Sequence, residues 1–253
     1  MRKAALAILI AATLPSVTFS QSHPTDKVSQ AIEWFSLSNN IKVHKRLSFL
    51  VEGQFRFAGQ FQPMQFQFRT GADIHITKNF SVMPLGYVYT WNPTYGKQPA
   101  QYVNNEHRFY QQVFYKHHAG KFHFSHRGRL EERHIQVHTM ENGEVINEGY
   151  DRYLTRFRYR LMVNVPFKGT EIAPKTTFAS FYNETFIEWG KGVVHRAPDQ
   201  NRLFAGVGYQ ASKKFTMTGG FLYHMLVKLN GVQQENNFGF QVNATYNFDL
   251  TNQ

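Results

Sequence analysis

The sequence predicts an all-β protein, an antiparallel transmembrane β-barrel of 10 to 12 strands with a charged Arg and Glu lumen. Three observations predict this class. Residues 237–250 alternate without a break between apolar and small or polar side chains, as in a strand with one lipid face and one wet face. The 24 Phe and 13 Tyr suit a lipid face bordered by aromatic girdles. The same alternation recurs along the chain, at a spacing longer than the roughly 8 to 12 residues of a soluble β-sandwich.

The N-terminus has the pattern of a secretory signal. Arg2 and Lys3 precede an apolar run over residues 4–14, and small residues follow at the positions that a signal peptidase reads. We expect a signal peptide over residues 1–20. The alternative, a membrane anchor, needs about 20 apolar residues, and this run is shorter. The chain contains no Cys, which excludes a lipidated Cys and disulfides. The expected location is the outer membrane of a Gram-negative bacterium, reached through the periplasm.

Eleven segments have the strand pattern. Residues 21–45 are expected to form a first strand or an N-terminal plug, and residues 46–253 the barrel. Single-chain bacterial barrels have an even number of strands and both termini in the periplasm, so ten or twelve strands are expected and one of the eleven segments is expected to be wrong. The segments are 30–39, 46–58, 64–76, 80–91, 105–117, 122–134, 151–164, 176–189, 201–211, 214–227 and 236–250.

Short and long connections alternate along the chain, which predicts two different rims. By the rule for bacterial barrels, the short turns face the periplasm and the long loops face outside. The short turns are 77–79, 119–121 and 212–213, and the long polar loops are 92–104, 135–150, 190–200 and 229–235.

Charged residues occupy the positions that alternate with the aromatic ones. An Arg facing lipid costs about 2 to 4 kcal/mol at the membrane midplane, so these side chains are expected to face the lumen. There they either pair as a structural lattice or, where uncompensated, line a water-filled path that favours anions. The expected lumen-lining residues are Glu52, Arg56, Arg69, Asp73, Glu106, Arg108, Arg127, Arg129, Glu131, Arg133, Arg152, Arg156, Arg158, Arg160, Glu184, Glu188 and Arg202.

Several pieces of the sequence together resemble a known family. They include residues 107–112 (HRFYQQ), 127–133 (RGRLEER), 156–160 (RFRYR) and 200–202 (QNR). In this order they resemble the outer-membrane barrel family DUF2490 over most of the mature chain. The resemblance implies an outer-membrane location, with membrane lipid as its surroundings, and no activity. The terminal aromatic strand resembles the insertion signal of such barrels, which implies the barrel-assembly machinery as a partner.

Enzymatic activity is the main alternative from another class. Barrel hydrolases that act on lipids use a Ser and a His near one rim. Ser125 and His123 share a strand face here, but they lie near the expected periplasmic turn, so the chain is expected not to be an enzyme.

The remaining functional classes receive less support from the sequence. The net charge of +11, or +9 without Arg2 and Lys3, comes from Arg residues at alternate strand positions, so nucleic-acid binding is not expected. Histidine spacing matches no closed zinc site, and neither a metal nor a cofactor is expected. A soluble periplasmic β-protein would expose rows of Phe and Tyr to water and aggregate.

Overall fold

Backbone pairing closes the chain into a β-barrel of eleven strands. The computed structural model describes residues 26–96, 102–193, 197–229 and 231–251, so the expected signal peptide lies outside the described residues. Among the residues described, no helix is long and apolar enough to span a membrane. The wall strands are β1 (Asp26–His44), β2 (Leu47–Ala58), β3 (Gln62–His75), β4 (Phe80–Trp91), β5 (Glu106–Ala119), β6 (Phe122–Ile135), β9 (Arg152–Pro166), β10 (Thr176–Trp189), β11 (Gln200–Gln210), β12 (Phe215–Val227) and β13 (Gln233–Asp249).

The predicted fold class is confirmed, and each of the eleven expected segments overlaps one wall strand. The expectation of an even strand number was wrong. Of the two roles considered for the stretch before residue 46, the structure places Asp26–His44 in the wall as β1. Neighbouring strands run antiparallel except at one seam, where β1 pairs with β13 in parallel. An odd barrel requires such a seam, because its first and last strands run in the same direction.

The seam places the two ends of the wall at opposite rims. Asp26 pairs with Gln233, and Lys42 pairs with Asp249 at the other end of the same two strands. The first strand therefore begins at the rim that carries the long loops, and the last strand ends at the rim of short turns. This differs from the expectation that both termini share the periplasmic rim.

A close approach at the seam requires glycine. Gly239 pairs with Ile32, and a Cβ placed on Gly239 would lie 1.7 Å from the backbone oxygen of Ile32. The backbone of Ile32 cannot move away from such a Cβ as the end of a flexible side chain could. The hydrogen of glycine is therefore what lets β1 and β13 close the wall here.

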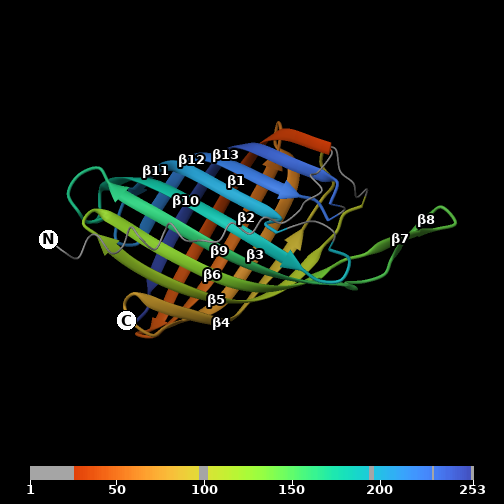
Figure 1. The fold of residues 1–253 in the computed structure, drawn as a ribbon. Coiled ribbons are helices and arrows are strands. Elements are labelled where there is room, and N and C mark those ends of the chain that lie inside the picture. The colour runs from red at the N-terminus through yellow and green to blue at the C-terminus, as the bar shows by residue number, and fades with distance from the viewer. Residues whose placement is uncertain (1–25, 97–101, 194–196, 230, 252–253) are drawn as a thin grey trace, which may run out of the picture.

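The long loop after β6 contains a hairpin that the sequence prediction treated as plain loop. Strands β7 (His138–Glu141) and β8 (Glu144–Asn147) pair with each other only, and the hairpin projects from one end of the barrel while the C-terminus lies at the other (Figure 1). Asn142 and Gly143 form its turn with positive φ angles of 50° and 86°. An Asn-Gly pair is the usual sequence signal for such a turn.

Candidate functional site

Charged side chains fill the barrel interior around Glu131 on β6. This carboxylate is 0% exposed. Arg156 and Arg158 of β9 each donate a hydrogen bond to one of its oxygens at 2.6 Å. Arg129 and Arg108 lie at 3.5 and 3.7 Å from the carboxylate. Four guanidinium groups thus share one buried carboxylate, and burial of these charges is tolerated because they are paired.

A second carboxylate extends this network along the wall. Glu184 of β10 is 3% exposed and accepts hydrogen bonds from Arg127 and Arg158, with an Arg158 Nη2 to Oε1 distance of 2.8 Å. Arg202 of β11 lies 3.7 Å from the same carboxylate. Arg158 therefore connects Glu184 with Glu131, and the charges form one continuous network across neighbouring strands.

The network continues toward the long-loop rim. Glu106 pairs with Arg108 at 2.8 Å and with Arg133 at 2.7 Å. Arg133 also donates to Glu188. On the other side of the barrel Glu52 pairs with Arg69 and accepts a hydrogen bond from Ser38 at 2.8 Å.

The remaining residues expected in the lumen differ in their placement. The Arg160 guanidinium lies 5.6 Å from the Tyr182 ring centre. Asp73 is half-buried, 3.8 Å from His75. Arg152 is exposed, because it is the first residue of β9 and lies at the rim rather than within the wall.

Arg56 is different from the other buried arginines because no carboxylate pairs with it among the described residues. Its guanidinium donates hydrogen bonds to the side-chain oxygens of Gln54, Gln65 and Gln67. Its carbon Cζ lies 4.1 Å from the centre of the Trp34 ring. The charge of Arg56 is held by polar and aromatic contacts without a compensating anion.

A polar cavity of about 240 Å³ lies between this interior and the long-loop rim. We call it the rim cavity. Loop residues Thr94, Tyr95 and Asp199 line its outer part, and Arg56 and Arg202 are among the side chains of its inner part. Seven of its lining residues are Arg or Lys and three are Asp or Glu. Carboxylates behind the lining compensate several of these basic groups: Glu131 pairs with Arg156 and Arg158, Glu184 with Arg158 and Arg202, and Glu235 with Lys228. Arg56 has no such partner among the described residues.

Sequence reasoning missed two residues of this region, Trp34 and His224. His224 is 3% exposed, lines the rim cavity and meets the Trp34 ring edge-on at 5.1 Å. A signal was present in the sequence, because His224 alternates in phase with the inward-facing Leu222 of β12. An isolated His among apolar residues gave no reason to choose it.

The Ser and His pair considered for hydrolysis does not form a catalytic pair. Nε2 of His123 lies 2.7 Å from the backbone oxygen of Thr170, and no hydrogen bond joins Ser125 to His123 among the described residues. Within the same residues, no group of three or more His, Asp or Glu side chains is placed to hold a metal ion.

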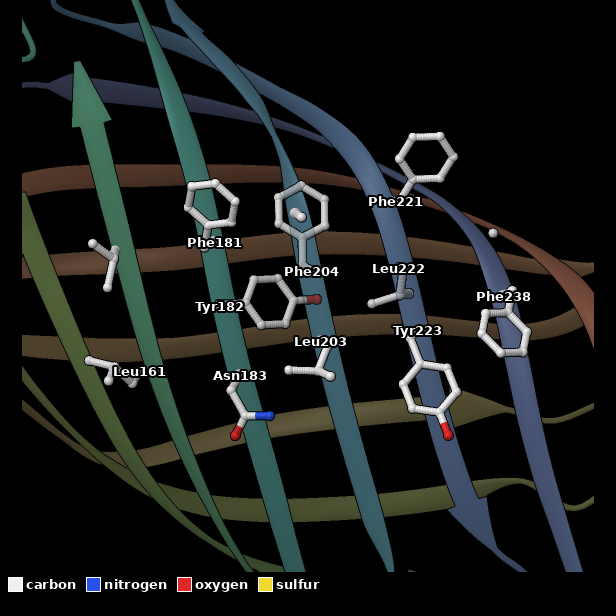
Figure 2. A pocket seen from close by; sticks show the side chains of 13 residues that line it. Leu161, Phe181, Tyr182, Asn183, Leu203, Phe204, Phe221, Leu222, Tyr223 and Phe238 are labelled. Carbon is white, nitrogen blue, oxygen red and sulfur yellow. The ribbon is translucent and has the colours of Figure 1, made fainter. Parts of the chain in front are cut away.

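The outer wall is apolar and aromatic. Figure 2 shows side chains of five adjacent strands, β9 to β13, on one side of the barrel. Phe181, Leu203 and Phe221 are 49%, 48% and 68% exposed, whereas the residues that follow them, among them Tyr182 and Leu222, are buried. The strands therefore present one exposed apolar outer face and one buried inner face, with the period of two that the sequence indicated.

Comparison with known proteins gives a family and one distant structural likeness. The model of a family described as "Protein of unknown function (DUF2490)" matches residues 33–236. The crystal structure of the siderophore receptor PirA from Pseudomonas aeruginosa is similar over 73% of this chain and 32% of that one, with 12% sequence identity and a TM-score of 0.26. The chain thus spans about a third of that receptor's length. No curated protein matches it.

Proposed function

This chain belongs to the DUF2490 family, whose function is unknown, and on that premise we propose that it is an outer-membrane barrel sealed by its own interior side chains. Its role is structural: it holds a closed wall in the membrane and presents the long-loop rim. The observation that carries the proposal is the complete burial of Glu131 among four arginines. A wide water-filled path would leave such a carboxylate exposed.

The outer-membrane location is supported by the wall and by the N-terminal pattern. Large apolar side chains such as Phe221, Phe238 and Phe240 are 68%, 57% and 55% exposed, and a soluble monomer rarely exposes so many in one band. The signal-like residues 1–20 provide a route across the inner membrane.

Passage of small anions is the second candidate, and one observation favours it. Seven basic residues against three acidic ones line the rim cavity, and one of the seven, Arg56, has no carboxylate partner among the described residues, so its charge would attract anions to the mouth of a path. The sealed barrel and the anion path make opposite predictions about conductance.

Conductance in planar bilayers under a KCl gradient tests the proposal. We expect the folded wild-type barrel to be silent. We expect a double variant, Arg158→Ala with Arg160→Ala, to show steady currents, because it removes the side chain that connects Glu131 to Glu184. Steady wild-type channels with an anion-biased reversal potential would overturn the sealed barrel and establish the second candidate.

A lipid hydrolase is not supported by the geometry. His123 contacts the backbone of Thr170 instead of Ser125, and in the part of the chain that the structure describes neither residue has the partner that a nucleophile and base need.

A further inference from the structure

The rim cavity contains polar atoms that no described protein group satisfies. Within the described ranges, both ring nitrogens of the buried His224 have no hydrogen-bond partner, nor do Nε of Arg202 and Nε1 of Trp34. About nine in ten buried polar groups in folded proteins have a partner. Other buried atoms of the described interior, such as Nε of Arg69 and Nε of Arg127, also lack a partner. Here four such atoms belong to three residues in mutual contact, and two of the three, Arg202 and His224, line the cavity.

These residues are packed around a single ring. The guanidinium carbons of Arg56 and Arg202 lie 4.1 and 4.9 Å from the centre of Trp34, and the His224 ring lies 5.1 Å from it. Arg202 and His224 are also directly paired across β11 and β12. Of these residues, Arg56, Arg202 and His224 line the rim cavity.

The charge of this cluster is not balanced. Among the described residues Arg202 has one carboxylate within 4.0 Å, that of Glu184 at 3.7 Å, and Arg158 already donates to this carboxylate at 2.8 Å. Arg56 has none among the described residues, as noted above. Burying a charge is costly unless a partner compensates it, so a negative group in the cavity would stabilise Arg56 and supplement the shared carboxylate of Arg202.

We infer that the rim cavity binds a small oxyanion, a solute bearing a phosphate or carboxylate group, between Arg56, Arg202 and His224. Guanidinium groups match the oxygens of both ions. An imidazole has a donor and an acceptor when neutral, so His224 can serve a hydrogen phosphate through either nitrogen. A cavity of about 240 Å³ has room for such an ion with several water molecules.

This inference goes beyond the sealed barrel, because a closed lumen can still bind a ligand at its mouth. The inference also limits the size of the ligand. Residues of the Arg and Glu network line the cavity, so a solute much larger than the cavity could not enter without breaking ion pairs such as Arg133 with Glu106.

Fluorescence of Trp34 provides a direct test. Replacing Trp91 and Trp189, which are 38% and 46% exposed on the outer wall, by Phe leaves Trp34 as the reporter. The folded barrel in zwitterionic detergent is titrated with inorganic phosphate, and separately with citrate, while sodium chloride holds the ionic strength constant. We expect a saturable change in emission with at least one of the two, and their relative affinities distinguish phosphate from carboxylate ligands.

Variants decide whether the response comes from this site. Arg56→Gln and His224→Phe should each raise the dissociation constant about tenfold or more, since each removes a charged or polar contact to the anion. Arg152→Gln removes an exposed Arg at the same rim and should leave binding unchanged. Heat-modifiable migration on gels verifies that each variant is folded. Absence of a saturable response in the folded wild-type reporter, or equal affinity in a folded Arg56→Gln variant, would overturn the inference.

Discussion

Replacing Glu131 by Gln should severely destabilise the barrel. The change keeps the size of the side chain and removes its charge. Arg156 and Arg158 would lose a carboxylate that each now contacts at 2.6 Å, while Arg108 and Arg129 would lose a countercharge at 3.7 and 3.5 Å.

The expected loss in the free energy of unfolding follows from the two short hydrogen bonds to Glu131. A hydrogen bond to a charged group contributes about 1.5 to 3 kcal/mol, so two such bonds set a scale of about 3 to 6 kcal/mol. A Gln oxygen can still accept one hydrogen bond, but its amide would face guanidinium donors. Breaking a buried ion pair by removing one partner typically costs about 3 to 5 kcal/mol, and we expect the loss for Glu131→Gln to fall in that range.

Reversible urea unfolding of the barrel in phospholipid vesicles, followed by Trp fluorescence, measures this loss. The matched control is Glu132→Gln, the same change one position along β6, where the side chain is half-buried on the opposite face of the strand. It should change the free energy of unfolding by less than about 1 kcal/mol. A Glu131→Gln variant as stable as this control would refute the view that the interior network is tightly coupled.

Three further predictions concern the seam, the outer wall and the hydrolase alternative. Gly239→Ala should prevent closure of the seam and abolish the heat-modifiable folded band on gels, whereas Gly219→Ala, whose Cβ would meet nothing nearer than 3.9 Å, should fold normally. Phe221→Arg should lower the free energy of unfolding in a bilayer by about 2 to 4 kcal/mol, measured by the same urea titration. Phe167→Arg, in a connection between strands, should lower it much less. Equally small losses for the two variants would argue against a lipid-facing wall. Ser125→Ala should leave the release of fatty acid from labelled phospholipid at the wild-type level. If the wild type releases fatty acid and the Ser125→Ala variant does not, the enzyme hypothesis is restored.

The strand positions could be predicted because they depend on interactions of each residue with its immediate surroundings, not on pairing between distant segments. An Arg such as Arg158 cannot face lipid cheaply, so its neighbours Phe157 and Tyr159 must face out, and this sets the phase of the whole strand. They are 39% and 42% exposed. The same argument does not apply at strand ends, where a charged side chain can reach water from either face. The sequence pattern therefore predicts Arg152 in the lumen, whereas the structure shows it exposed at the start of β9.

The strand number and the rim cavity could not be predicted because both depend on pairing between distant segments. Nothing in the alternation of β1 or β13 indicates that they pair in parallel. Likewise, Trp34 and His224 are 190 positions apart in the sequence and meet only because the wall closes. The acidic partners of the Arg residues were recognised as inward-facing, but the absence of a partner for Arg56 depends on distances that a sequence does not contain.

If the barrel is in the outer membrane, as proposed, the parallel seam affects how the wall is inserted. A barrel with an even number of strands can be inserted entirely as hairpins, each delivering its two ends to the side from which it came. With eleven strands one strand is left without a hairpin partner, and the two end strands of the wall, β1 and β13, meet at the seam. In the proposed location, the ends of the wall at Asp26 and at Asp249 lie on opposite faces of the outer membrane. An epitope attached at one end would be detected on intact cells, and an epitope attached at the other end only after the outer membrane is permeabilised.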